Sequence, residues 1–362
     1  MPITLNPKHE RKQMSHNLDM TNGRANIAFL GSRNDVWHKM GQEMVAGQSI
    51  EDWSKAAGLG WSAVKVPAVV ALNGDAWDHI PAEKRFLPAP DRAFIVRSDN
   101  AGLLGYVSGE TDASGYQIVQ PREVLEWFER YIAVDDRFKL DVCGSLDGGR
   151  RIWATAKYCG DVSVAGESHA MRVLMSTTYD ASGATINQAT ATRVVCQNTI
   201  RIAHSDTRAQ IKTRHSTKFD AAKVGRELAQ LASGFAQYKA IGDAMAQVEM
   251  SAQQFVDFFQ DILDIPRDAK RDDLSARKAN QFDALKHAYA TSVDEGAERK
   301  SVWAALQAVT RYADHDRSVQ KGNQLENVAR FNSAQFGSGD QIKGRAMNLL
   351  LPMIKDRVPV AA

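Results

Sequence analysis

The apolar residues of this chain change their spacing near residue 220. Before that point, short β-branched runs alternate with turn-forming residues, a pattern typical of antiparallel strands. From Val224 to Val248 the large apolar residues recur at steps of three and four, which predicts a long helix that packs on a partner surface. Strands followed by helices predict an α+β fold, with an antiparallel sheet in the first part and an all-α second part.

The length of 362 residues predicts more than one domain, because a single ordinary core rarely grows this large. We expect a flexible N-terminal arm at residues 1–35, where the sequence is polar and has no sustained period. An α+β domain at 36–219 and a helical domain at 220–362 should follow.

Turn and cap signals divide the first domain. Ser49 and Asp52 form a capping-box pattern, which predicts a helix that stops at Gly58. Asn73-Gly74 predicts a tight two-residue turn after a strand. Pro121 suits the first position of a helix, which we expect to cover one face of a three-stranded meander in a β-β-β-α unit. The first predicted strand is Ser62–Leu72. The meander consists of the strands Ala93–Arg97, Leu103–Val107 and Tyr116–Val119.

Two hairpins and a series of helices complete the predicted elements. The hairpins join Phe138–Leu146 to Arg151–Tyr158, and Met171–Tyr179 to Ala184–Thr192. Val194–His204 could form a short helix or continue a strand, and we favour a helix. Ser251 and Gln254 form another capping box, and helical stretches follow around Phe282 and Leu285, Trp303 and Leu306, Leu325 and Val328, and Ile342–Met353.

Composition restricts the compartment and the class of protein. The formal net charge is +2, so only a local patch could attract an anionic partner. The three cysteines cannot all pair, which suits a reducing cytoplasm. No apolar run approaches the roughly 20 residues that span a bilayer. The N-terminus also lacks the apolar core of a signal peptide, so we expect a cytoplasmic protein without membrane contact.

Catalytic signatures are mostly missing from the chain. It has no nucleotide-binding P-loop, no zinc-protease motif and no nucleophile elbow, so we expect no enzymatic activity, cofactor or metal site. Cys196 is better explained as a buried, inert thiol than as a nucleophile. Gly337-Ser338-Gly339 fits a turn before a helix capped by Asp340 better than a phosphate cradle. An enzyme with a site assembled from His38, His204 and His215 is a third-ranked alternative.

A cationic stretch between residues 200 and 226 is the strongest functional signal. It has a local excess of five positive charges, because seven cations face only Asp206 and Asp220. Arg208, Lys212, Arg214 and Lys218 would share one face of a strand, and such a row could follow a phosphate backbone. A solvated strand face explains the row about equally well. The cations are Arg201, Arg208, Lys212, Arg214, Lys218, Lys223 and Arg226.

Several segments resemble a phage- and plasmid-like family known as domain of unknown function 932. The similar segments are Trp37-His38-x-x-Gly41, SIEDWSKAAGLGW from Ser49, FIVRSDNAGLLGYVS from Phe94, YQIVQPREVLEWFE from Tyr116, GSLDGGRRIWATAKY from Gly144, TATRVVCQNTIRIAHS from Thr190 and FNSAQFGSG from Phe331. The resemblance implies an accessory protein of a mobile element and gives no activity. The β-β-β-α order also resembles, more weakly, the core of single-strand annealing recombination proteins.

These observations lead to a hypothesis of single-stranded DNA binding and annealing in recombination or replication, without catalysis. Homo-oligomers would form through sheet edges and the helix at 224–248. A non-catalytic interaction protein that binds a host or phage protein is the alternative. The expected phosphate contacts are Arg193, Arg201, Arg208, Lys212, Arg214 and Lys218, and Asn198 would orient a sugar or base edge.

Overall fold

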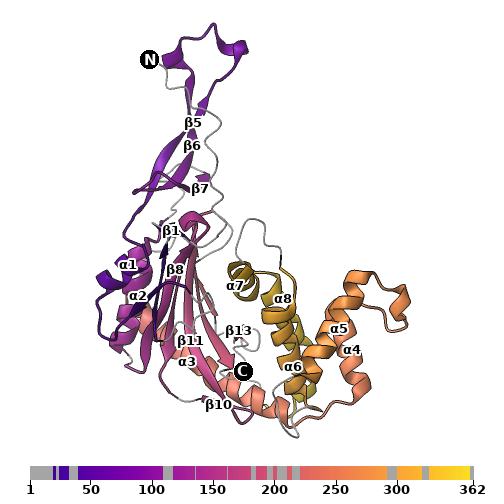
Figure 1. Ribbon diagram of the computed structural model, residues 1–362. Coiled ribbons are helices and arrows are strands. Elements are labelled where there is room, and N and C mark those ends of the chain that lie inside the picture. Colours follow the sequence, from indigo (N-terminus) through magenta and orange to yellow (C-terminus); the bar gives the residue numbers. More distant parts are fainter. Residues whose placement is uncertain are drawn as a thin grey trace.

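The computed structural model describes residues 19–21, 24–31, 40–108, 117–134, 136–160, 162–180, 185–193, 199–201, 210–213, 221–291, 300–319 and 326–358. Its strands lie in the N-terminal part and most of its helical residues follow residue 220, so the predicted α+β class is confirmed (Figure 1). The described residues include no helix that is long and apolar enough to cross a membrane.

A nine-stranded sheet forms the centre of the molecule. Its strands are ordered β13-β12-β11-β9-β8-β3-β4, with β10 beside β11 and β14 beside β12. All neighbours are antiparallel except β3 and β4. The strands are β3 (Ile27–Leu30), β4 (Gln42–Met44), β8 (Phe138–Leu146), β9 (Arg151–Tyr158), β10 (Val162–Val164), β11 (Glu167–Thr178), β12 (Thr185–Arg193), β13 (Thr199–Arg201) and β14 (Gln210–Thr213).

Both predicted hairpins are present in this sheet. β8 returns into β9 through Asp147–Gly149, where all three residues adopt positive φ angles. Two glycines suit this turn because left-handed backbone is strained for most other residues. β11 pairs with β12 along eight consecutive positions, from His169 opposite Arg193 to Ser176 opposite Ile186.

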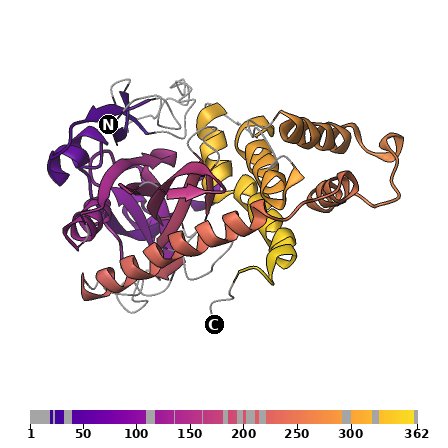
Figure 2. The same cartoon turned by 90° about the horizontal axis from the view of Figure 1, so that it is seen from below.

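Helices cover both faces of the main sheet. On one face, α2 (Pro121–Val134) and α3 (Ala221–Ala246) share a core with the sheet residues Cys143, Ala154 and Val173 (Figure 2). On the other face, Phe331 of α7 (Glu326–Phe336) packs with Trp153 and Leu174. Alternate residues of a strand point to opposite faces, so two helical layers enclose one sheet.

The long helix α3 is used within its own chain. Phe235 stacks near Phe138 and Tyr158, and Tyr238 lies against Trp303. From Leu231 to Met245 the apolar face predicted from the spacing is therefore buried on the sheet and the following helices. These side chains are not available for the oligomer contact expected from the sequence. The same core also crosses the domain boundary predicted after residue 219.

A smaller antiparallel sheet projects from the main body (Figure 1). It consists of β5 (Ala63–Ala71), β6 (Phe86–Arg97) and β7 (Leu103–Ser108), in the order β5-β6-β7. Gly105 allows the small sheet to approach the main body closely, because a Cβ atom there would lie 1.9 Å from the carbonyl oxygen of Tyr179. The meander was predicted to use Tyr116–Val119 as its third strand. In the structure Gln117–Val119 form no strand, and β5 is the third strand of the sheet.

The connection from β5 to β6 also differs from its prediction. Instead of a two-residue turn at Asn73-Gly74, the chain makes 3-10 turns at Asp75–Trp77 and Ala82–Lys84 before β6 begins at Phe86. The hairpin is consequently longer than predicted and extends far from the sheet below it (Figure 1).

Short helices make up the rest of the fold. Ser49 is the N-cap residue of α1 (Ile50–Ala56), and Ser251 is the N-cap residue of α4 (Ala252–Leu263). Both predicted capping boxes are confirmed. The remaining helices are α5 (Ala276–Ala290), α6 (Val302–Arg311) and α8 (Ser338–Leu350), with a π-helical turn at Tyr312–Asp316. Two-residue strands β1 (Met20–Thr21) and β2 (Arg24–Ala25) pair with each other.

Three further expectations need correction. Ile27–Leu30 lie within the predicted arm, but they form a strand of the main sheet with Ile27 and Phe29 fully buried. Thr199–Arg201 form a strand and not the favoured helix, because they pair with β12. Helix α2 packs mainly on β8 and β9, and it reaches the small sheet through Gln120, whose side chain bonds the backbone of Ala63.

Candidate functional site

One edge of the main sheet contains Arg201 and Lys212 of the cationic stretch, whereas its last two cations, Lys223 and Arg226, lie on α3. β13 and β14 both pair with β12, one after the other along its length. Arg201 lies opposite Thr190 and Lys212 lies opposite Ile186. These positions on β12 are four residues apart, which corresponds to about 13 Å along a strand. Arg193 is the last residue of β12 itself.

The backbone therefore brings three of the seven predicted contact residues to one border of the sheet. Asn198, Arg208, Arg214 and Lys218 lie outside the described residues. The same is true of Cys196 and of the three histidines considered for an enzyme, His38, His204 and His215. The predicted single face of Arg208, Lys212, Arg214 and Lys218 stays a prediction, although Gln210–Thr213 do form a strand.

Polar side chains surround this border. Gln210 on β14 donates a hydrogen bond of 2.8 Å to the side chain of Gln188 on β12. Arg172 on β11 pairs with Asp141 at 2.6 Å, and both side chains are largely buried. Arg172 is thus already neutralised. Helices α7 and α8 lie next to β13.

Many arginines elsewhere on the described surface are also matched by carboxylates. This matters because a paired cation contributes less to the attraction of a polyanion. The pairs include Arg122 with Glu51 and Glu126, Arg267 with Asp257 and Asp261, Arg271 with Asp283, Arg330 with Glu326, and Arg345 with Asp264. The sequence between residues 200 and 226 has few acids to make such pairs.

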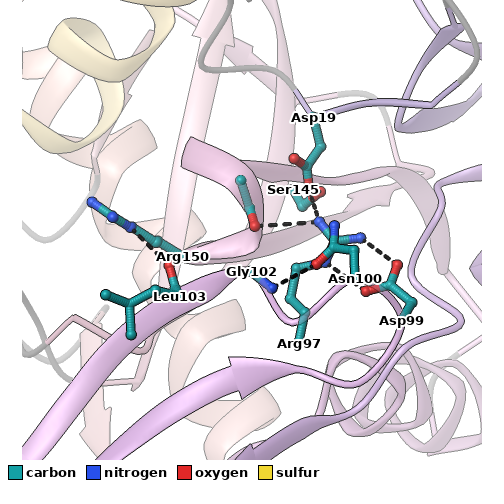
Figure 3. Close-up of polar contacts among 9 residues, drawn as sticks. Asp19, Arg97, Asp99, Asn100, Gly102, Leu103, Ser145 and Arg150 are labelled. Carbon is teal, nitrogen blue, oxygen red and sulfur yellow. Dashed lines mark hydrogen bonds and ion pairs between the residues drawn. The ribbon is translucent and has the colours of Figure 1, made fainter. Parts of the chain in front are cut away.

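A second polar cluster lies at the base of the projecting sheet (Figure 3). Arg97, the last residue of β6, donates hydrogen bonds to Asp19, Asp99 and the carbonyl oxygen of Gly148. Its guanidinium also lies 4.5 Å from the centre of the Trp61 ring. Only 6% of the arginine side chain is exposed. The cluster therefore joins three sequence segments that resemble the family, around Trp61, Arg97 and Gly148.

The charges of this cluster reinforce one another. Burial lowers the pKa of Arg97, but hydrogen bonds to Asp99 and the charge of Asp19 outweigh burial, so the pKa lies above its usual value. The hydrogen bond from Arg97 in turn lowers the pKa of Asp99. Ser145 donates a further hydrogen bond of 2.7 Å to Asp19. With its donors directed at protein acceptors, Arg97 acts as a structural clamp between the two sheets.

The junction of α7 and α8 contains another family-like segment, Phe331–Gly339. Phe331 stacks 5.0 Å from Trp153, and Phe336 lies beneath the guanidinium of Arg151 at 4.4 Å. The hydroxyl of Ser333 accepts a hydrogen bond from the amide of Gly339. The segment thus attaches the helices to β9. Gly337, and not Asp340 as predicted, is the N-cap residue of α8.

A buried ion pair stabilises the same helices. Lys343 on α8 lies 2.7 Å from Asp314 in the π-helical turn, and the exposed fractions of the two side chains are 1% and 0%. A π-helical turn often marks a functional position. Here its acidic residue is already engaged by a lysine, so we assign the pair a structural role.

Metal ligands, cysteines and cavities are the remaining features of the described residues that bear on the kind of site. They contain no group of three or more histidine, cysteine or acidic side chains that could hold a metal ion. Burial raises the pKa of the Cys143 thiol, which suits an unreactive cysteine. A cavity of about 170 Å³ between α4 and α5 is lined by Phe282, Arg271 and Asp283, and it is smaller than the ~300–1,000 Å³ of most ligand sites.

Sequence reasoning missed Arg97 and Lys343. Lys343 lies in the mostly polar segment 340–345 and only the structure shows that it is buried, whereas Arg97 directly follows the apolar run Phe94-Ile95-Val96. The position of Arg97 is a usable signal, because buried charges require partners. The partners themselves are distant in sequence and could not be identified from it.

These features define an α+β protein with a cationic segment along the edge of its main sheet and an apolar sheet that projects from it. The chain belongs to the family described as Domain of unknown function (DUF932), whose model matches residues 110–335. The match includes β8 to β14 and helices α2 to α6, while the projecting sheet precedes it. Neither curated proteins nor solved structures show a significant match to the chain.

Proposed function

We propose that this protein is a non-catalytic, cytoplasmic accessory protein of a phage or plasmid that binds and anneals single-stranded DNA in recombination or replication. The observation that carries the proposal is the attachment of the cationic stretch to one strand. β12 ends at Arg193, and the chain returns to its free side with Arg201 and again with Lys212. Arg193, Arg201 and Lys212 are thereby attached to one border of the sheet, which supports the proposal.

Such a border suits a flexible polyanion. Each phosphate that a lysine or arginine neutralises releases counterions, so binding is driven by many weak contacts and needs no cofactor. Arg193, Arg201, Arg208, Lys212, Arg214 and Lys218 would provide these contacts. Asn198 would contact a sugar or a base edge.

A second candidate function is that of a protein-interaction module of a mobile element. The projecting sheet favours this candidate, because large apolar side chains are exposed on it. A host or phage protein would then be the partner. This candidate predicts no salt-sensitive binding of nucleic acid.

The proposed function is tested with the triple variant Arg208→Ala, Lys212→Ala and Arg214→Ala. Fluorescence anisotropy with a labelled single strand, measured at several salt concentrations, gives the affinity and its salt dependence. Loss of three phosphate contacts should reduce the slope of log K against log salt by about 2, since each contact contributes about 0.7 for single strands. The rate of annealing of two complementary strands should fall in the same variant.

A matched control removes the same charge from a different place. Lys286, Lys355 and Arg357 are exposed in the helical part, and replacing all three by alanine should leave the salt slope near that of the wild type. If both triple variants lost the same affinity for the single strand, the loss would be due to the change in net charge and not to the proposed interface. Unchanged binding in the first variant would remove the proposed interface.

A further inference from the structure

The outer face of the projecting sheet presents an apolar surface to solvent. Strand pairing places its side chains in two rows that cross all three strands. The opposite face of the same strands is buried, with Ala93 and Ile95 in the main core. Tyr106 is the most exposed member of the outer face, at 56%. We call this surface the outer patch, and it consists of Val64, Val66, Phe94, Val96, Leu103 and Tyr106.

Beyond the outer patch, the hairpin of β5 and β6 continues as a two-stranded ribbon. Val69 and Val70 are adjacent and so point to opposite faces, yet both are exposed. On the paired strand, Phe86 and Leu87 are exposed as well. An isolated two-stranded hairpin is marginally stable in water, so a ribbon with apolar side chains on both faces gains stability when another surface covers it.

The exposed apolar area is concentrated here. Among the described residues, ten of the twelve exposed large apolar side chains lie between Val64 and Tyr106. Ten side chains of this kind, each about half exposed, present on the order of 800 Å² over the outer patch, both faces of the ribbon and its tip. A contact through the outer patch and one ribbon face would bury part of this area, which corresponds to an interface below the standard ~800 Å² per partner. The exposed area is more than isolated surface residues would explain.

The charges of the surface favour a second copy of the same chain. Val66–Ala71 and Phe86–Pro90 contain no charged residue. Two identical surfaces of this type can approach without like-charge repulsion, whereas a strongly charged partner would find nothing to pair with. A twofold contact requires only that one surface complements itself.

Prolines determine which part of the sheet can make the contact. Pro67 lies on the edge strand β5, and Pro88 and Pro90 lie on the part of β6 that β7 does not cover. Proline has no backbone N–H to offer to an added strand, so these positions weaken edge-to-edge pairing. The faces of the ribbon therefore suit a contact better than its proline-containing edges.

We propose that two copies of this chain form a dimer in which their projecting sheets pack face to face through the outer patch and the ribbon. The inference is separate from the proposed function, because the interface contains none of the residues assigned to DNA. Either proposal can therefore fail alone.

The test uses the full chain and measures its mass by size-exclusion chromatography with light scattering over a series of concentrations. The wild type should have the mass of two chains. The double variant Val66→Glu/Tyr106→Glu places four like charges in the interface and should raise the dissociation constant by about 100-fold or more. The matched control Val45→Glu/Leu349→Glu alters two exposed apolar residues elsewhere and should remain dimeric.

Circular dichroism and thermal unfolding establish that each variant is folded. If the double variant is not, the single change Tyr106→Glu replaces it, since that side chain lies largely in solvent. A dimeric wild type and control with a monomeric patch variant would support the interface. A wild type that is monomeric at every concentration would overturn it. This holds also if the outer patch of that monomer binds lipid vesicles or another protein. Persistence of the dimer in the patch variant would overturn it equally.

Discussion

The guanidinium of Arg97 lies 2.6 Å from the carboxylate of Asp19, although 78 residues separate them in the sequence. Arg97 ends β6 of the projecting sheet, and Ser145 of the main sheet donates a hydrogen bond to the same carboxylate. The ion pair therefore fixes the base of the projecting sheet to the body. If the outer patch meets a second copy, this cluster determines the direction in which the patch faces.

Replacing Arg97 by methionine should destabilise the protein severely. The change leaves Asp19 largely buried without its cationic partner, and breaking a buried pair in this way costs about 3–5 kcal/mol. Urea unfolding followed by circular dichroism measures the loss. Arg92→Met on the same strand is the control, because Arg92 is exposed and its replacement should change the free energy of unfolding by no more than about 0.5 kcal/mol. Similar losses for both variants would refute the clamp.

The pKa of Asp99 makes part of the stability depend on pH. Its hydrogen bond with Arg97 lowers the folded-state pKa below the ordinary value of 3.8. The stabilisation is therefore fully present above pH 3.8 and is lost as the pH falls through the lower, folded-state pKa. Asp99→Asn should reduce the melting temperature at neutral pH, and the difference from the wild type should shrink in acid. A difference that stays constant down to the acid limit would contradict this linkage.

The elements that the sequence predicted well are those specified by neighbouring residues. Ser49 and Ser251 cap their helices with partners three positions away, so the entire motif is visible in a short segment. The β8–β9 hairpin follows from Asp147-Gly148-Gly149 in the same manner. The seam of α3 was clear from its spacing, but its partner was not, since a periodic apolar face does not reveal whether it meets its own sheet or another chain.

The elements that the sequence predicted wrongly depend on contacts between residues that are distant in the chain. Ile27–Leu30 form a short apolar run that becomes a strand only because β8 and β4 lie on either side. Thr199 and Ile200 are β-branched and suit a strand, but only the pairing with the free side of β12 decides their conformation. The Asn73-Gly74 signal was overridden by the longer hairpin tip. For the candidate site, the composition identified the cationic stretch, whereas its position at a sheet edge required the fold.

The buried pair of Lys343 and Asp314 offers the most discriminating test of the helical part. Lys343→Met alone leaves the Asp314 carboxylate fully buried without its lysine and should cost about 3–5 kcal/mol. The double variant Lys343→Met/Asp314→Leu removes both charges and replaces them with apolar groups of similar volume, which is often neutral or stabilising. It should therefore be more stable than the single variant, as measured by urea unfolding. Additive losses would show that the two charges stabilise the junction independently, and the ion pair would then not be what holds α8 to the π-helical turn.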